Sequence, residues 1–352
     1  MSIALQHLTD IASWGFDDII DVRSPSEFAE DHIPGAISLP VLSDEERAIV
    51  GTIYVQDDRF KARRVGAALV ARNAADHIEQ RLSEKDGSWR PLVHCWRGGQ
   101  RSGSFASILS QIGWRAELLE GGYKAYRRLV VDTLYDKPIS PRLILIDGNT
   151  GTAKTEILHL LQLAGAQMID LEGLAAHRGS LFGAIQGGQP SQKMFESRLA
   201  KAVVDLDPNR PVFVEAESNK IGERSIPTSF WRAMSEAPRI TVKSSLSARS
   251  EFLLRSYWDL LENQQELLDR LSKLQSFHSK DRLSEWIASA CEGRFKDLAE
   301  GLMEHHYDPR YAKTFQRRER QDLGSIELKT LDTKTLGETA IPQILEMSKR
   351  LD

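Results

Sequence analysis

One cysteine lies in a sequence that favours nucleophilic chemistry. Cys95 follows the apolar run 91–93, which predicts a buried strand, and precedes a glycine-rich turn and a helix predicted to begin at Phe105. This arrangement aims backbone N–H groups and the positive end of a helix dipole at the sulfur. Arg97 and Arg101 add two cations, in the spacing Cys-x5-Arg-Ser. Such surroundings favour the thiolate at neutral pH and form a cradle for an anion.

Two chemistries fit this cysteine loop. A cysteine phosphatase would attack phosphorus with the thiolate and would need a general acid to protonate the leaving oxygen. No carboxylate lies within 96–100, so the acid would have to come from elsewhere, such as Asp57 or Asp58. A chalcogen transferase would carry sulfur or selenium on Cys95 without an obligatory acid. The loop leaves both chemistries open.

A second anion-binding sequence follows further along the chain. It matches Gly-x4-Gly-Lys-Thr except for an alanine at the last glycine, and it lies between a predicted strand over 142–147 and a predicted helix over 156–163. The backbone amides would hold a diphosphate, the lysine would neutralise it and the threonine could ligate Mg²⁺. The alanine methyl group would crowd the anion or require other backbone angles. The residues are Gly148, Asn149, Thr150, Gly151, Thr152, Ala153, Lys154 and Thr155.

Acidic residues end two of the predicted strands. Glu215 and Glu217 end the strand predicted over 211–216 and could act as a Walker B-like acid or Mg²⁺ ligand, although a structural carboxylate pair fits as well. Asp170 ends the strand predicted over 166–169 and is a further candidate.

Other residues are candidates for contact with a substrate or an RNA. His177 and Arg178 precede a Gly-Ser pair, and a structural histidine is an equally good interpretation. The basic tail could contact phosphates, although its spacing also fits a solvated helix face. The tail residues are Arg310, Lys313, Arg317 and Arg318. No ligand-spaced cluster of cysteine and histidine predicts a structural metal site.

The elements that position these residues predict two α/β domains. Short strands alternate with helices in both halves, which is typical of parallel sheets. Leucines at helical spacing after residue 251 predict core packing, because no heptad is sustained. The predicted divisions are an α/β domain over 1–131, a proline-containing linker over 132–141, a P-loop α/β domain over 142–250 and a helical extension with the basic tail over 251–352.

Composition narrows the class of protein. A chain of 352 residues predicts about two domains. Its net charge of −4 means that nucleic-acid binding would need a local basic face. Two cysteines and no secretion-type N-terminus favour a cytoplasmic protein. No apolar run approaches the ~20 residues of a membrane span.

The first ~130 residues resemble a rhodanese domain. Three segments carry the resemblance: Asp-Val-Arg-Ser-Pro-Ser-Glu-Phe at 21–28, His-Ile-Pro-Gly-Ala at 32–36 and Leu-Glu-Gly-Gly-Tyr at 119–123. The cysteine loop is one residue longer than in the usual rhodanese, as it is in rhodanese-fold phosphatases. The segment 44–85 is longer than a minimal rhodanese domain needs.

The whole chain resembles the tRNA 2-selenouridine synthase family. The resemblance implies replacement of the sulfur of wobble 2-thiouridine by selenium from selenophosphate, through an S-geranylated intermediate made from geranyl diphosphate. It implies the tRNA anticodon arm as partner, transient contact with a selenophosphate-producing enzyme, and no need for ATP. The segments that carry it are the cysteine loop 94–102, the phosphate loop, 170–175, 177–180, 189–192, 215–218, 221–222 and 306–311.

This resemblance gives each anion cradle a role. The phosphate loop would hold the diphosphate of geranyl diphosphate, and apolar side chains such as Leu181, Phe182 and Phe195 would hold the C10 chain. Cys95 would receive or activate selenium, with its two arginines neutralising the phosphate. The alternative is a rhodanese-type sulfurtransferase or cysteine phosphatase whose P-loop domain binds ATP as a regulatory switch.

Overall fold

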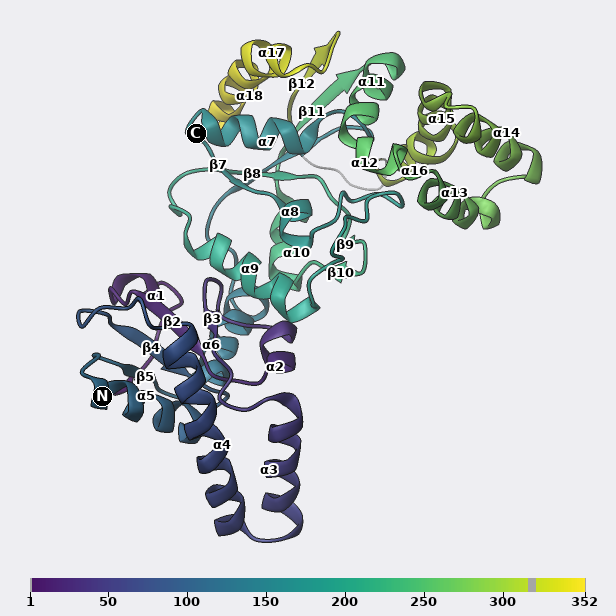
Figure 1. Ribbon diagram of the computed structural model, residues 1–352. Coiled ribbons are helices and arrows are strands. Elements are labelled where there is room, and N and C mark those ends of the chain that lie inside the picture. The colour runs from purple at the N-terminus through teal and green to yellow at the C-terminus, as the bar shows by residue number, and fades with distance from the viewer. Residues whose placement is uncertain (1, 316–320, 352) are drawn as a thin grey trace. The chain divides into compact units, whose positions relative to one another are not determined.

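The chain forms two compact units. The computed structural model describes residues 2–315 and 321–351. The first unit comprises Met1–Lys137 and Pro190–Asp205, and the second comprises Pro138–Gln189 and Leu206–Asp352. Each contains a five-stranded sheet with helices around it (Figure 1). The α/β class predicted from the sequence is confirmed.

All strands of the first sheet are parallel, in the order β1-β5-β4-β2-β3. The central strand β4 is buried along its whole length, as its apolar run predicts. Its carboxyl end leads directly into the cysteine loop. The strands are β1 (Ser2–Ile3), β2 (Asp18–Asp21), β3 (Ile37–Ser38), β4 (Pro91–His94) and β5 (Glu117–Leu119).

Helices surround this sheet, and two of them form a long antiparallel hairpin (α3 and α4 in Figure 1). The helix α2 begins as predicted, with Ser24 as N-cap, Pro25 in the first turn and Glu27 closing a capping box. The helices are α1 (Asp10–Ser13), α2 (Pro25–Glu30), α3 (Asp44–Gln56), α4 (Arg59–Gln80), α5 (Gln100–Ile112), α6 (Gly122–Val131) and α9 (Gln192–Val204).

The predicted linker over 132–141 is too long. A π-helical turn continues α6 through Asp132–Asp136, because Leu134 is fully buried there and the Tyr135 hydroxyl donates to Glu196 at 2.7 Å. The helix α9 was also assigned to the wrong domain. It lies in the first unit although its sequence falls within the predicted P-loop domain.

The second sheet is also wholly parallel, in the order β12-β11-β6-β8-β7. The central strand β6 is buried throughout and ends at the phosphate loop. The strands are β6 (Leu143–Asp147), β7 (Gln167–Ile169), β8 (Val212–Glu215), β11 (Arg239–Ser244) and β12 (Asp322–Leu328), and a separate antiparallel pair is formed by β9 (Lys220–Ile221) and β10 (Arg224–Ser225).

The sequence predicts a helical region after residue 251, but the structure also has a strand there, β12. The strand β12 joins the sheet edge because its two leucines and its isoleucine are all buried in the core, while Asp322, Ser325 and Glu327 are exposed. The predicted leucine stripe does form a core between helices. The helices of this unit are α7 (Lys154–Leu163), α8 (Leu171–Ala175), α10 (Thr228–Glu236), α11 (Leu246–Ser256), α12 (Trp258–Leu261), α13 (Gln264–Ser272), α14 (Lys280–Cys291), α15 (Phe295–Leu302), α16 (Asp308–Phe315), α17 (Thr333–Thr335) and α18 (Ile341–Ser348).

Within the described residues, no helix combines the length and the apolar character that a membrane crossing requires.

Candidate functional site

The cysteine loop joins the end of β4 to the start of α5. Cys95 is 5% exposed, and the helix begins at Gln100, five residues before the predicted start. Gly98 and Gly99 both adopt left-handed backbone angles, at φ +55° and +71°, which allow this sharp entry. The Ser102 hydroxyl donates to the Cys95 sulfur at 3.3 Å. The loop therefore directs a hydroxyl and a helix N-terminus at the sulfur.

The segment 121–124, which begins with a second glycine pair, packs against the backbone of the cysteine loop. The backbone N–H of Tyr123 donates to the Cys95 carbonyl at 2.8 Å, and that of Lys124 donates to the Trp96 carbonyl at 3.0 Å. Gly122 has a φ of +58°, and a Cβ atom there would lie 2.4 Å from the Cys95 carbonyl oxygen. The Gly-Gly-Tyr segment therefore permits a close backbone approach that holds the loop.

The two arginines of the loop have different surroundings. Arg101 donates to Glu27 at 2.7 and 3.3 Å, and Arg47 lies 3.1 Å from the same carboxylate. Burial would raise the pKa of Glu27, but the hydrogen bond and charge of Arg101 outweigh it and hold that pKa below its ordinary value. Arg97 is exposed. Arg97 is thus the loop cation available to an incoming anion, whereas Arg101 mainly anchors α5 to α2.

Buried charges lie beneath the cysteine loop. Arg23 is 1% exposed and donates to Asp21 at 2.6 Å, and its guanidinium lies 3.9 Å from the centre of the Tyr123 ring. The Tyr123 hydroxyl donates to Asp31 at 2.5 Å. Burial raises the pKa of Asp31 despite this bond. These contacts fix the Gly-Gly-Tyr segment, and so the backbone that supports Cys95.

The phosphate loop lies between β6 and α7, in the strand-loop-helix arrangement that the sequence predicts. The helix α7 begins at Lys154, so its first backbone N–H groups are unsatisfied within the helix. Gly148 and Gly151 have φ values of +153° and +84°. The ammonium of Lys154 donates to the Gly148 carbonyl at 2.9 Å and so reaches back across the loop.

Ala153 adopts the backbone angles that the usual glycine would take. Its φ is 59° and its ψ is 28°, in the left-handed region. The residue is 3% exposed, and its methyl group packs in the hydrophobic core beside Ile157. The core therefore accommodates the methyl group, and the left-handed backbone angle of a residue with a Cβ atom costs about 1–2 kcal/mol.

A cavity of about 450 Å³ opens beside the phosphate loop. Backbone, charged and aromatic groups all face it. Besides the loop it is lined by Glu156, His159, Glu172, Arg178, Gly179, Ser180, Ala216, Glu217, Phe252, Leu253, Ser256, Tyr257, Tyr307 and Tyr311.

Two carboxyl groups meet in this cavity. Glu172 accepts the Thr155 hydroxyl at 2.9 Å. Burial raises the pKa of Glu172 to about 8, with the charge of Glu217 contributing, and burial also raises the pKa of Glu217. A Cβ atom on Gly179 would lie 2.5 Å from Glu172 and 2.9 Å from Glu217, so glycine is needed for their approach. Their oxygens, with the Thr155 hydroxyl, suit Mg²⁺ bound to a diphosphate.

The three acids predicted from the sequence occupy different positions relative to the phosphate cavity. Glu217 lines the cavity, whereas Glu215 is fully buried, accepts the backbone N–H of Leu171 at 3.1 Å and has a pKa raised by burial. Asp170 caps α8 and lies 2.9 Å from His159. Glu215 and Asp170 therefore organise the base of the cavity rather than its wall.

His177 and Arg178 also separate in role. Arg178 lines the cavity, donates to Asp259 at 2.9 Å and lies over the Tyr257 ring at 4.8 Å. His177 is 8% exposed and lies behind it, against the turn at Gly222. The structure thus brings Arg178 to the phosphate loop and makes His177 part of the supporting turn.

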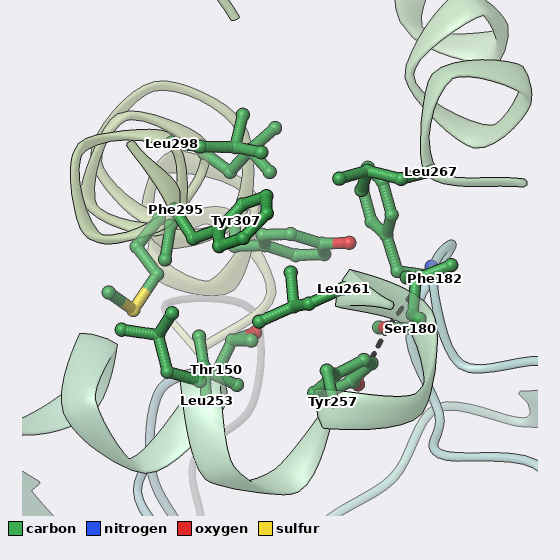
Figure 2. Close-up of a pocket in the computed structure, with 15 residues that line it drawn as sticks. Thr150, Ser180, Phe182, Leu253, Tyr257, Leu261, Leu267, Phe295, Leu298 and Tyr307 are labelled. Atoms are coloured by element: carbon green, nitrogen blue, oxygen red, sulfur yellow. Dashed lines mark hydrogen bonds between the residues drawn. The ribbon is translucent and has the colours of Figure 1, made fainter. Parts of the chain in front are cut away.

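An apolar pocket adjoins the phosphate cavity (Figure 2). Figure 2 shows side chains from α11, α13 and α15 converging on it, with the Ser180 and Tyr257 hydroxyls 3.0 Å apart at one side. The walls shared with the phosphate cavity are Thr150, Ser180, Leu253, Tyr257 and Tyr307. The apolar pocket and the phosphate cavity therefore lie on either side of one shared wall.

Of the three predicted chain-binding residues, Phe182 lines this pocket. Leu181 is 38% exposed and does not. The prediction for Phe195 is wrong, because α9 places this side chain in the core of the first unit, where it is fully buried.

Comparisons with known proteins identify the family. A model of the tRNA 2-selenouridine synthase AAA domain matches residues 141–289, and one of the rhodanese-like domain matches residues 5–129. The tRNA 2-selenouridine synthase of Hahella chejuensis is 33% identical over 336 residues, 85% of this chain and 86% of that protein. That of Pseudomonas syringae is 33% identical over 330 residues, 84% and 87% of the two chains. The chain belongs to the tRNA 2-selenouridine synthase family.

Membership in the synthase family confirms the rhodanese-like and P-loop-like assignments of the two α/β units. The basic tail remains a prediction. Arg310 lies against His306 and over the Phe277 ring at 4.6 Å, so it contributes to packing. Lys313 belongs to α16, and Arg317 and Arg318 lie outside the described residues.

Glu172 and the tyrosines of the cavity were not among the site residues predicted from the sequence. Glu172 lies two positions after the predicted acid Asp170, within a segment that carries the family resemblance. The signal that could have found it is Gly179, whose missing side chain makes room for two carboxyl groups.

Proposed function

We propose that this chain is a tRNA-modifying transferase that replaces the sulfur of wobble 2-thiouridine by selenium, using geranyl diphosphate and selenophosphate. The observation that carries the proposal is that an apolar pocket shares a wall with the cavity beside the phosphate loop. A nucleoside triphosphate would not need the apolar pocket, whereas a prenyl diphosphate requires both the pocket and the cavity. Family membership supports the tRNA substrate.

In the first step the thiocarbonyl sulfur attacks C1 of geranyl diphosphate. The C1–O bond breaks and its electron pair leaves on pyrophosphate, while the uracil N3 proton is released. The Lys154 ammonium and the amides at the start of α7 would stabilise the departing charge. The pocket itself is about 70 Å³, so it would take the far end of the C10 chain while the rest lies along the shared wall.

In the second step the Cys95 thiolate would activate selenophosphate. The sulfur attacks phosphorus, the P–Se bond breaks and selenide leaves with the electron pair, so the phosphoryl group stays on Cys95 until water removes it. Selenide is the anion of a much stronger acid than an alcohol, so it leaves without protonation. This explains how a phosphatase-like loop works without an acid at 96–100. Selenide then adds at C2 and geranylthiol departs.

Mass spectrometry of nucleosides from 2-thiouridine tRNA tests the two steps. We expect Lys154→Ala to lose geranylation, and Cys95→Ser to accumulate S-geranylated nucleoside without selenation. Wild-type selenation by Cys95→Ser would refute the role of the sulfur. Turnover of ATP by the wild-type protein, with no geranyl transfer, would instead support the sulfurtransferase or phosphatase alternative.

A pocket variant tests the role of the apolar pocket. Dimethylallyl diphosphate lacks five carbons of the geranyl chain, which is at most about 4 kcal/mol of burial, or roughly a thousandfold in affinity. We therefore expect the wild-type protein to prefer geranyl diphosphate over dimethylallyl diphosphate. Leu261 lines the pocket, so Leu261→Trp would fill the pocket and should reduce this preference for the longer chain. Leu163→Trp is the matched control, since Leu163 is 84% exposed. An unchanged preference in Leu261→Trp would place the prenyl chain elsewhere.

A further inference from the structure

The long helical hairpin of the first unit has no role in the chemistry above. Its two helices pack through small side chains, because every fourth residue of α4 along one stripe is buried. A Cβ atom on Gly66 would lie 3.4 Å from Val50 of α3, so glycine brings the helices close together. The buried residues of the stripe are Ala62, Gly66, Val70 and Ala74. The exposed residues of α4 lie outside this stripe.

That solvent-exposed surface is strongly basic in its first half. Between residue 59 and residue 75 there is no Asp or Glu, and five cations are exposed there: Arg59, Lys61, Arg63, Arg64 and Arg72. Lys61 is paired with Asp57 at 2.6 Å. The four arginines form no ion pair with any residue that the structure describes. Arginines without local acids are suited to phosphate contacts.

The acids of the hairpin lie away from this half of α4. Three occupy the first turn of α3, two lie at the turn between the helices, where Asp58 caps α4, and two follow residue 75. No long side chain projects from the basic half of α4 between Arg64 and Arg72, since the exposed residues there are alanines. A nucleic-acid backbone can approach such a surface closely.

Aromatic side chains lie beside the cations at the tip. Phe60 is 65% exposed and Tyr54 is 47% exposed, with the Arg59 guanidinium 5.4 Å from the centre of the Tyr54 ring. Exposed aromatic rings next to arginines are the groups on which unpaired bases stack. Their combination with four unpaired arginines favours a single-stranded or loop region of an RNA over a simple anion.

The base of the hairpin is joined to the cysteine loop. Arg47 of α3 and Arg101 of α5 bind the same carboxylate, that of Glu27. An RNA held along the hairpin would therefore lie on the element that is anchored next to Cys95. We propose that the α3–α4 hairpin is a tRNA-docking surface, in which the α4 arginines contact phosphates and the tip aromatics contact unpaired bases. The inference rests on the proposed function only in taking tRNA as the substrate.

The salt dependence of tRNA binding gives the loss of affinity expected when a phosphate contact is removed. Each phosphate contact contributes a slope of about 0.7–0.9 in the logarithm of affinity against the logarithm of salt. Losing one contact should therefore weaken binding roughly 5- to 8-fold at ~0.1 M salt relative to ~1 M. The double variant Arg63→Gln/Arg64→Gln should lower tRNA affinity by roughly 25- to 60-fold and reduce the slope by about 1.4–1.8.

The test compares this variant with Lys280→Gln/Arg282→Gln, which removes the same charge from α14. tRNA affinity is measured across salt concentrations, and pyrophosphate affinity reports on the phosphate cavity. We expect only the hairpin variant to lose tRNA affinity, with pyrophosphate binding unchanged in both. Phe60→Ala should weaken tRNA binding without changing the slope. Equal losses in both double variants, or none, would overturn the proposal.

Two further outcomes separate the hairpin from the proposed function. A wild-type protein that binds no tRNA would refute the proposed function itself. Hairpin-dependent binding to vesicles of anionic phospholipid, with tRNA binding unaffected by Arg63→Gln/Arg64→Gln, would refute tRNA docking and assign the basic and aromatic tip to a lipid surface.

Discussion

Gly122 provides a sharp test of how the cysteine loop is held. In Gly122→Ala the new methyl group would lie 2.4 Å from the Cys95 carbonyl oxygen and 3.1 Å from the Trp96 carbonyl. Both contacts are with backbone, so the cysteine loop must move by about an ångström. That movement breaks two hydrogen bonds, from Tyr123 at 2.8 Å and from Lys124 at 3.0 Å. Each is worth about 0.5–1.5 kcal/mol.

The backbone angle adds a second cost that a control can isolate. Alanine at φ +58° costs about 1–2 kcal/mol, so Gly122→Ala should lose about 2–5 kcal/mol of the first unit's stability. Gly15 has a φ of +65°, and a Cβ atom there meets nothing within 4 Å. Gly15→Ala should therefore lose only the ~1–2 kcal/mol of the backbone angle.

Calorimetric unfolding and alkylation of Cys95 measure the two effects. A Cys291→Ser background removes the other cysteine, which is exposed. We expect Gly122→Ala to unfold at a lower temperature than Gly15→Ala, to alkylate faster at Cys95 because the loop has shifted, and to lose selenation. If both variants unfold at the same temperature and alkylate at the same rate, the close approach of the two backbones does not hold the loop.

Three further predictions concern the ionisation of Glu172, the hydrogen bond of Tyr123 and the need for α9 in the first unit. In the absence of divalent cations, pyrophosphate affinity should fall as pH rises through about 8, because ionised Glu172 repels the anion; Glu172→Gln should abolish this dependence in titration calorimetry. Tyr123→Phe should destabilise the first unit by about 1.5–3 kcal/mol, since Asp31 loses a donor, whereas the exposed Tyr54→Phe should change stability by less than about 0.5 kcal/mol in urea unfolding. A fragment ending at Lys137 should fail to give a cooperative unfolding transition, and linking 190–205 to it should restore one.

Glu172 also gives the stability of the second unit a definite pH dependence. Its pKa is about 8 in the folded protein and 4.5 as the ordinary value, so the unfolded chain releases this proton first. The stabilising contribution is complete below pH 4.5 and is lost as pH rises towards 8. Unfolding measured across this range should therefore show a steeper decline in the wild type than in Glu172→Gln.

Features encoded by neighbouring residues could be predicted from the sequence. The capping box at Ser24 and Glu27 lies within four residues, and the strands β4 and β6 are continuous apolar runs at the centre of parallel sheets. The start of α5 was missed because its first turns are polar. Phe105 and Leu109 are buried on one side of that helix while the polar residues face outward.

Features that depend on distant partners could not be predicted in this way. Glu172 lies on α8 and Glu217 follows β8, and nothing near Glu172 in the sequence indicates the second carboxyl group. Arg101 was predicted to neutralise a bound phosphate. In the structure it is instead paired with Glu27 of α2, a partner that is distant in the sequence. The strand β12 was missed because a glycine and a serine interrupt its apolar positions, and because it follows a long helical region in the sequence.

The helix α9 explains why the domain boundaries themselves were hard to predict. Its amphipathic pattern gave the right helix, but the same pattern fits either core. Polar contacts decide between them: Ser197 donates to the buried Asp31 at 3.0 Å, and Glu196 pairs with Arg127. Without α9, Asp31 would lose one of its donors and Arg127 would be left with the more distant Asp31 as a carboxylate partner, at a cost of several kcal/mol in a buried site. The first unit therefore requires residues that the chain supplies only after it has begun the second sheet, and the two units cannot be separated by a single cut.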